Sequence, residues 1–446
     1  MTQYKLPLLV IGVGTMALAA IFFHLPYING LPGFWVWEWR DSGYFFPAMM
    51  MAPSLLLVLG GLWLGNNGTR AAVPLALFAM AMLYSQVMGI YVLANDVAVI
   101  KHIVYSRYTT GYFTDAARIT DLGAFLENFH LHRLSLHANT HPAGPIIHYY
   151  IAISLFGMDA GAYAGAGLIG VVSTAGVFVV YILAGLWTTE ARSRLVACGL
   201  YATLPGLVVF FPAFDLAYPV ISVLMIYLWR RSFDDLRMAA GLGGILFVMM
   251  FFAYNLLVMG SFMVMMSAVW IMGAEEKGVA IRRVVVAGAV AVLLWLGLNL
   301  ALHALTGYDP ILAFRSAIEA QKRMLGVVHR PYITALPFNI TDFALGAGYM
   351  AIALFAIAVW DAIKNRRPAL DANTMTIICA AQIAIVDLSG LLPGETARVW
   401  LFMQPFVIIP AGLALARFPL PWMVIVFTLQ WLIMVALRAS MVFRGW

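Results

Sequence analysis

The sequence predicts an all-α fold, a single polytopic bundle of about 12 to 14 transmembrane helices with interfacial helices on its external side. Three observations lead to this class. Hydrophobic residues make up 63% of the 446 residues and charged residues only 10%, with a mean hydropathy of +0.91, which ordinary soluble domains do not reach. Apolar stretches of about 20 residues recur along the whole chain, each long enough to cross a hydrocarbon core. Basic residues gather in short segments between these stretches.

The apolar runs define the predicted spans in chain order. The segment 146–156 is too short to be a span, so we expect a half-helix or a tilted segment there. The first run has no small-residue cleavage site and predicts an uncleaved helix rather than a signal peptide. The predicted spans are 6–25, 46–65, 71–95, 161–187, 195–211, 216–230, 238–255, 257–273, 284–304, 341–361, 373–390, 400–416 and 420–437.

The distribution of charge predicts which segments face the cytoplasm. The formal net charge is +6, but its placement is typical of cytoplasmic loops and not of a nucleic-acid-binding patch. Eleven basic residues lie in four short loops: Arg192 and Arg194; Arg230, Arg231 and Arg237; Lys277, Arg282 and Arg283; Lys364, Arg366 and Arg367. The segments 26–45, 96–145, 212–215, 306–340 and 391–399 are then external. Because these segments hold most of the polar residues, we expect the function to reside on the external face.

The external segment 96–145 carries a concentration of histidine. Six of the nine histidines lie between residues 102 and 148, five of them in this segment and His148 just after it: His102, His130, His132, His137, His141 and His148. Within the segment, apolar residues recur at helical spacing over 114–130 and predict an interfacial helix. Thr114 or Asp115 would be its N-cap. The Asp115 carboxylate is alternatively a general base, or a metal ligand, for an incoming hydroxyl.

A stiff turn, Thr140-His141-Pro142-Ala143-Gly144-Pro145, ends this segment. Its two prolines restrict the backbone, and Gly144 permits a close backbone approach. The turn therefore predicts a defined position for His141. His137 and His141 would hydrogen-bond a substrate or, with Asp115, bind a divalent cation such as Mg²⁺ or Mn²⁺.

Charged residues in the remaining external segments are further candidates. Asp215 lies among aromatic and apolar residues, where an unused carboxylate is costly. Glu395 and Arg398 would either pair on a helical turn or leave Arg398 to bind a phosphate. In the segment 306–340, cations that oppose the positive-inside tendency indicate an anionic ligand such as a lipid phosphate: Arg315, Lys322, Arg323, His329 and Arg330. Glu38 and Asp41 in the first external segment would pair locally with Arg40 or take part in catalysis.

The order of these features resembles the membrane glycosyltransferases of the GT-C fold. An external Asp precedes a "THPAGP" turn and the "IIHYYIAISLFG" segment, and Asp215 begins a span that ends in Trp229-Arg230-Arg231. The closest resemblance is to the protein O-mannosyltransferase and aminoarabinose transferase branch, over residues 71–240, with "GETARVW" as a late external motif. Residues 1–70 would add two N-terminal spans, and 241–446 would supply the C-terminal spans with the external segments 306–340 and 391–399.

The resemblance implies an inverting transfer of a sugar from a polyprenyl-phosphate-linked donor at an external active site. It makes Asp115 and Asp215 the counterparts of the acidic residues of the first and second external loops. Two departures are that Ala116 follows Asp115 where the family places a Glu, and that the two additional spans leave Asp96 and Asp41 as rival leading acids.

We therefore expect an integral protein of a bacterial inner membrane that transfers a sugar to a hydroxyl of a lipid, glycan or protein on the periplasmic face. Asp115 would activate the acceptor, while Asp215, His137 and His141 would orient the sugar or a cation. Arg398, with Arg118, Arg323 or Arg330, would hold the phosphate. A transporter or flippase of lipid-linked glycans, with Asp387 as an intramembrane charge, and a glycan polymerase are the alternatives.

Overall fold

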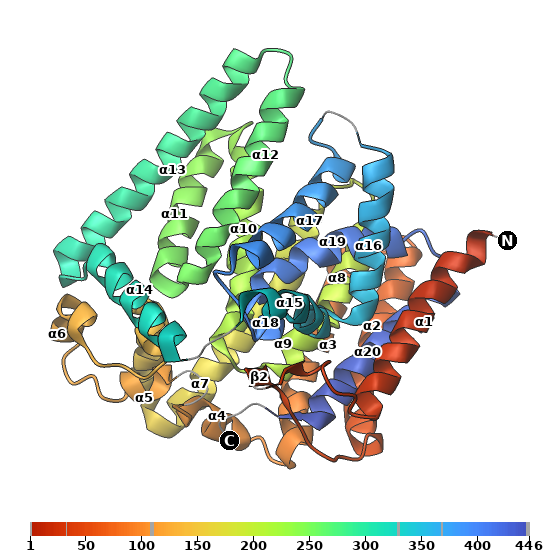
Figure 1. Ribbon diagram of the computed structural model, residues 1–446, viewed down its shortest axis with the longest axis horizontal. Coiled ribbons are helices and arrows are strands. Elements are labelled where there is room, and N and C mark those ends of the chain that lie inside the picture. The colour runs from red at the N-terminus through yellow and green to blue at the C-terminus, as the bar shows by residue number, and fades with distance from the viewer. Residues whose placement is uncertain (1, 33, 108–110, 328–330, 367–368, 443–446) are drawn as a thin grey trace.

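The computed structural model describes residues 2–32, 34–107, 111–327, 331–366 and 369–442 as an almost entirely helical bundle (Figure 1). The α-helices are α1 Thr2–Phe22, α2 Phe45–Asn66, α3 Ala72–Ala94, α4 Val99–Tyr105, α5 Tyr112–Ala116, α6 Leu122–Glu127, α7 Gly144–Ala184, α8 Ala191–Ala202, α9 Pro205–Val209, α10 Tyr218–Ser232, α11 Leu236–Phe252, α12 Met259–Gly273, α13 Lys277–Thr306, α14 Pro310–Val327, α15 Tyr332–Ala347, α16 Tyr349–Lys364, α17 Ala372–Ser389, α18 Thr396–Val399, α19 Gln404–Leu415 and α20 Leu420–Ser440. Short 3₁₀ turns are η1 Phe129–Leu131, η2 Ala138–Thr140, η3 Phe214–Ala217, η4 Tyr254–Val258 and η5 Leu401–Met403. The strands are β1 Gly30–Leu31, β2 Trp35–Val36, β3 Glu38–Trp39 and β4 Met441–Val442.

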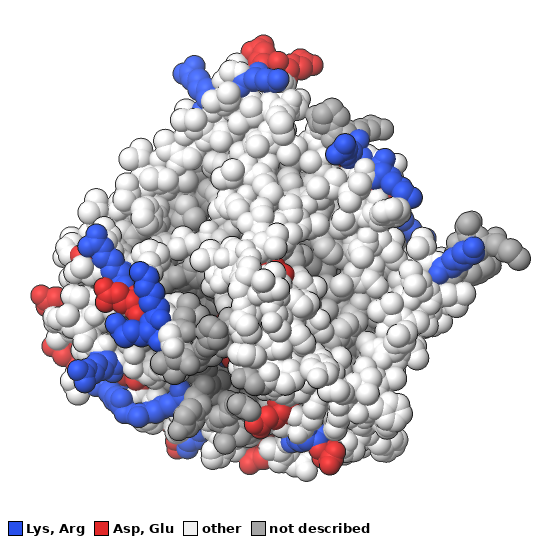
Figure 2. Space-filling model, in the orientation of Figure 1, with Lys and Arg blue, Asp and Glu red and all other residues white. Residues whose placement is uncertain are grey.

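The helices confirm an all-α integral membrane protein. Within the described residues, eight helices are long and apolar enough to cross a membrane: α1, α2, α3, α7, α12 with η4, α13, α17 and α20. The bent pair α15–α16 would make a ninth. The predicted count of about 12 to 14 is reached only when the shorter helices α8, α10, α11 and α19 are included as well. On the face shown in Figure 2, charged side chains lie toward the ends of the molecule and leave a broad uncharged band between them.

The segment 146–156 is a half-helix, as predicted. Helix α7 has a non-helical residue, Gly157 (φ 78°, ψ 175°), which separates 144–156 from 158–184. The two parts fold back on each other, since Gly161 lies against the backbone of Ala152 and Ile153. His148 Nε2 lies 3.0 Å from the carbonyl oxygen of Gly165. This helical hairpin places its N-terminal end, where the proline-rich turn enters, inside the bundle.

Two predictions about the C-terminal half were wrong. The segment 306–340 is not a loop, because α14 and most of α15 lie within it. The predicted span 341–361 is divided by a bend of 110° between α15 and α16. The bend is at Gly348 (φ 86°), where a Cβ atom would collide with the Gln430 amide. Gln430 Nε2 donates to the Ala347 carbonyl oxygen (3.3 Å), so a polar side chain serves a backbone group at the bend.

The prediction of one interfacial helix over 114–130 is also wrong, because the segment forms the two short helices α5 and α6. The predicted caps differ too. Gly111 precedes α5, Asp115 lies inside it, and Asp121 caps α6 by accepting a hydrogen bond from Ala124 N (3.0 Å). The Asp121 side chain accepts from a backbone N–H that would otherwise bond within a continuous helix, so α6 begins as a separate helix after it.

Segments predicted to be external lie toward one side of the bundle in Figure 1, with α5, α6 and α14 at the lower left, β2 at the lower centre, and α15 and α18 nearer the middle of the view. Strands β1 and β2 form a hairpin, and β3 pairs with β4 at the C-terminus. The indole of Trp37 donates to Asp342 in α15 (2.6 Å). Helix α14 packs on η1 and η2. The connection between α12 and α13 lies at the opposite end, and the predicted cytoplasmic residues Lys277, Arg282 and Arg283 follow it in the first turns of α13.

Candidate functional site

Four chain segments bring polar residues together at this end of the bundle. The residues of this cluster are Tyr112 in α5, His141 in the turn before α7, Asp215 in η3 and Arg398 in α18. The rings of Tyr112 and His141 meet edge to face with centroids 5.6 Å apart. The charges of Asp215 and Arg398 both act on Tyr112 and on His141. Three of the four, His141, Asp215 and Arg398, were predicted from the sequence. The four residues lie up to 286 positions apart in the chain (398 − 112).

Arg398 is the main cation of this cluster. Its side chain is only 9% exposed, and Nη2 pairs with the Glu395 carboxylate at 2.8 Å. Burial lowers the pKa of Arg398, but the charges of Glu395 and Asp215 outweigh that effect and raise it above its ordinary value. Its Nε is buried and has no hydrogen-bond partner in the described structure. A buried guanidinium with an unused donor is suited to bind an anion.

The position of Arg398 depends on a buried polar network beneath α18. The Asp342 carboxylate accepts hydrogen bonds from Trp37 Nε1 and from Ala397 N (3.0 Å). Asn339 accepts from Gly394 N (2.8 Å) and donates to Asp387 (2.9 Å). Because α15 and α17 are long elements, these bonds fix the short α18 to rigid parts of the bundle.

The proline-rich turn holds His141 as predicted. His141 Nδ1 lies 2.8 Å from the His137 carbonyl oxygen, so that nitrogen carries a proton and donates it. Gly144 lies so close to the Phe251 carbonyl that a side chain would not fit. Burial lowers the pKa of His141. The ring is therefore neutral at neutral pH, which leaves Nε2 as a hydrogen-bond acceptor.

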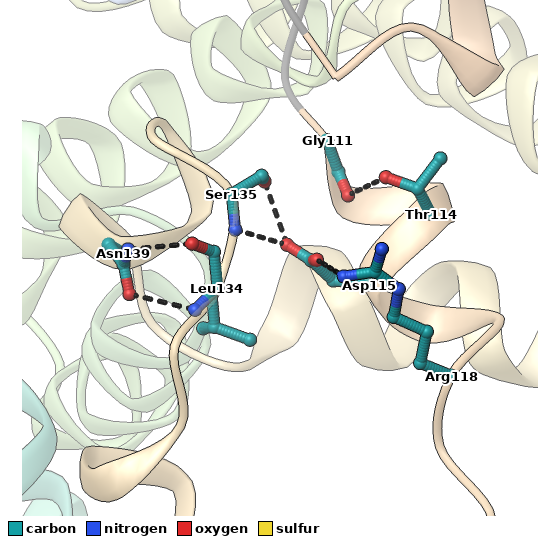
Figure 3. Close-up of polar contacts among 7 residues, drawn as sticks. All are labelled: Gly111, Thr114, Asp115, Arg118, Leu134, Ser135 and Asn139. Atoms are coloured by element: carbon teal, nitrogen blue, oxygen red, sulfur yellow. Dashed lines mark hydrogen bonds and ion pairs between the residues drawn. The ribbon is translucent and has the colours of Figure 1, made fainter.

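Asp115 is held by residues of its own segment (Figure 3). Its side chain is 3% exposed and accepts hydrogen bonds from Ser135 N (2.8 Å) and Ser135 Oγ (2.7 Å). Arg118 approaches the other carboxylate oxygen at 3.8 Å. Ser135 adjoins Leu134, whose backbone N and O are both bonded to the Asn139 side chain. Asp115 therefore anchors the loop 134–139 to α5.

The other predicted candidates do not join Arg398. Asp96, Asp41 and Glu38 are exposed, and Asp96 accepts a hydrogen bond from Ala98 N (2.8 Å). The Arg118 side chain is 59% exposed, and Arg323 is 71% exposed and 3.9 Å from Glu319. Arg330 lies outside the described residues.

The predicted cation site made of His137, His141 and Asp115 is not assembled. Across the described residues, no three His, Cys, Asp or Glu side chains are grouped so that they could hold a metal ion. Asp115 is bonded to Ser135, and the His141 ring faces Tyr112. A cation held by other ligands stays a prediction.

Sequence analysis missed Tyr112, Tyr218, Asn339 and Asp342. Burial raises the pKa of Tyr112 well above its ordinary value, so its hydroxyl is a permanent donor. Asp342 gave a signal that could have been used, because a carboxylate next to an apolar run is costly without partners. The tyrosines gave none, since aromatic residues are frequent in membrane interfaces.

No family model and no curated protein matches the chain. Because a fold alone does not identify a function, the function must be inferred from the site.

Proposed function

We propose that this protein is a membrane glycosyltransferase, which moves a sugar from a polyprenyl-phosphate-linked donor to an acceptor hydroxyl at the end of the bundle where the cluster lies. The acceptor is a hydroxyl of a lipid, a glycan or a protein. In a bacterial inner membrane this end would face the periplasm, because the opposite end carries the basic connections.

The observation that supports the proposal best is the buried Arg398 beside Asp215. A donor phosphate would accept hydrogen bonds from the guanidinium, whose Nε has no protein partner in the described structure. Glu395 already pairs with Arg398 at 2.8 Å, whereas Asp215 acts on it at longer range. The cluster thus offers an anion-binding group and a second carboxylate that is not its direct partner.

In the proposed reaction, the acceptor oxygen attacks the anomeric carbon and the bond from that carbon to the phosphate oxygen breaks. The bonding electrons leave with polyprenyl phosphate, and the proton of the acceptor hydroxyl passes to a carboxylate. We assign this base to Asp215, because it shares the cluster with Arg398 and His141. This departs from the sequence-based prediction, which made Asp115 the base and gave Asp215 an orienting role, because Asp115 holds the loop through Ser135.

His141 and Tyr112 would orient the sugar. The neutral His141 ring accepts a hydrogen bond at Nε2 and the Tyr112 hydroxyl donates one, which suits the hydroxyl groups of a sugar. Within the described residues, the positions of His137, His141 and Asp115 do not support a cation bound between them. The proposed proton transfer and phosphate contact are therefore assigned to protein groups.

The alternative of a transporter, which the sequence suggested through the intramembrane charge of Asp387, is less well supported than the transferase. Asp387 lies near the C-terminal end of α17 and accepts from Asn339 (2.9 Å). Asn339 in turn holds Gly394, so Asp387 serves the α18 network. A carboxylate on a transport path would instead face a central cavity.

The test is release of polyprenyl phosphate by the purified full-length protein from a panel of polyprenyl-phosphate-linked sugars, with envelope lipids and glycans as acceptors. We expect Asp215→Asn to lower the rate by on the order of 10²- to 10⁴-fold. Asp41→Asn, on the exposed surface, is the matched control and should leave the rate unchanged.

Thermal unfolding of each variant separates lost chemistry from lost folding. Normal turnover in Asp215→Asn would remove it from the base role. A similar fall in a well-folded Asp115→Asn alone would return that role to Asp115. No release from any donor by the wild type would argue against the transferase.

A further inference from the structure

Helix α14 carries a stripe in which apolar and cationic side chains alternate. Ile311, Arg315, Ile318 and Lys322 follow one another at intervals of four, three and four residues, so they lie on one face of the helix. All four are exposed, with Ile311 at 63% and Ile318 at 39%. The opposite face is made of small buried residues, Ala313, Ala317 and Ala320.

The stripe differs from the surface of a helix in water and from that of a transmembrane helix. Exposed isoleucines are unfavourable in water, and cations are unfavourable in hydrocarbon. A face that combines both is stable where an apolar layer meets a polar one. Long cationic side chains reach out of the apolar layer toward phosphates.

The preceding helix α13 indicates the depth at which α14 lies. Residues 284–305 of α13 form an apolar stretch of about 33 Å at 1.5 Å per residue, close to the thickness of a hydrocarbon core. The stretch begins after Arg282 and Arg283 and ends at Leu305, which is 84% exposed. Gly307 ends α13, and α14 starts at Pro310. Helix α14 therefore begins at a boundary of the hydrocarbon core.

We propose that α14 lies in the headgroup layer on the side of the membrane where the cluster is found, and that it binds anionic phospholipid. Ile311 and Ile318 enter the acyl boundary, while Arg315, Lys322 and Arg323 contact the headgroup phosphates. With Glu319 the helix has a net charge of +2 (three cations minus one anion), which complements an anionic surface. Figure 2 shows cationic side chains beside an acidic one on this part of the molecule, at the lower left.

The bound lipid would stabilise the segment that carries His141. The inner face of α14 packs on η1 and η2, and Ser316 Oγ donates to the His130 carbonyl oxygen (3.2 Å). Helix α14 would thus contact lipid with its outer face and the segment 129–141 with its inner face. The inference rests on α14 alone and holds whatever reaction the cluster performs.

The experiment uses the full-length protein with Ile318→Cys, labelled with a nitroxide, in nanodiscs. Cys198 and Cys379 are buried and provide little background. We expect the nitroxide to relax more with oxygen, which concentrates in lipid, than with a water-soluble nickel chelate. The same position then receives a fluorophore, and quenching by headgroup-labelled phosphatidylglycerol is compared with quenching by headgroup-labelled phosphatidylcholine.

Phosphatidylglycerol should quench about threefold or more strongly, since each cation near an anionic surface adds to the attraction. The triple variant Arg315→Gln, Lys322→Gln, Arg323→Gln should bring the ratio near one. The matched triple variant Lys277→Gln, Arg282→Gln, Arg283→Gln, at the other end of α13, should keep the wild-type ratio. Greater access to nickel than to oxygen, or a wild-type ratio of one, would overturn the proposal.

Discussion

Arg398 and the cationic residues of α14 lie at the same end of this molecule but differ in burial. Arg398 is 9% exposed and pairs with Glu395, and the neighbouring Ala397 N donates to Asp342. Arg323 on α14 is 71% exposed and 3.9 Å from Glu319. Both contradict the positive-inside tendency, and sequence analysis assigned both to one phosphate.

Burial, and not the type of residue, separates the roles that we propose for these cations. A guanidinium removed from water interacts strongly with a phosphate, and its planar donors are already oriented. An exposed cation is screened by salt, so it acts only together with its neighbours. We therefore expect one selective phosphate site at Arg398 and a diffuse lipid-binding surface on α14.

The largest effect expected from this comparison is on donor affinity. Arg398→Lys keeps the charge but loses the planar donor pair, so the affinity for polyprenyl phosphate should fall roughly 10- to 100-fold, or about 1.4–2.8 kcal/mol. Arg323→Lys is the matched control and should bind as the wild type does. Equal losses in the two variants, measured by tryptophan fluorescence titration, would contradict the distinction between buried and exposed cations.

An effect of similar size, on stability as well as on donor affinity, should follow from loosening α18. Asp342→Asn replaces one acceptor oxygen with a donor, so Trp37 Nε1 or Ala397 N loses its partner, at a cost of about 1–3 kcal/mol in the free energy of unfolding. Arg398 would lose its fixed position, and donor affinity should fall as well. The control is Asp361→Asn, which breaks an exposed pair with Arg417 (2.8 Å) and should cost less than about 1 kcal/mol. Unchanged thermal unfolding and donor affinity in Asp342→Asn would show that Arg398 does not depend on the network.

The smallest effect concerns pH. Burial lowers the pKa of His141 below 6.5, so the unfolded chain takes up its proton at a higher pH than the folded protein does. Stability contributed by the neutral ring is therefore present above pH 6.5 and is lost as the pH falls below it, by at most about 1.4 kcal/mol per pH unit. His141→Gln should remove that part of the pH dependence from thermal unfolding between pH 7.5 and 5.5. The exposed His132→Gln should not, and identical pH profiles for wild type and His141→Gln would refute the prediction.

Much of the fold could be predicted because a membrane-spanning helix is recognised from the hydropathy of its own stretch of sequence. Each of the thirteen predicted spans overlaps one or more helices, although 195–211 is divided into α8 and α9 and 341–361 into α15 and α16. The half-helix before Gly157 was predicted from the short length of 146–156. The errors occurred where one residue interrupts an otherwise suitable pattern. Gly348 bends α15–α16, and Asp121 starts α6 within an apolar periodicity that did not reveal the break.

The candidate site was less predictable. Asp215, His141, Glu395 and Arg398 attracted attention because polar groups are rare and costly in such a sequence. Their grouping was not visible in the sequence, and neither was the contact of Asp115 that led us to propose Asp215 as the base. Asp115 turned out to bond Ser135, a contact that depends on how the loop folds back 20 residues later.

Composition and periodicity by themselves determined the class of this protein, the approximate position of its helices and the concentration of polar residues in a few segments. Each of these depends on the transfer of local stretches of chain from water to lipid. Only the tertiary structure decided which carboxylate lies with Arg398, how α18 is held and which face of α14 is exposed. Those depend on contacts such as Trp37 with Asp342, 305 residues apart, whose partners no local pattern specifies.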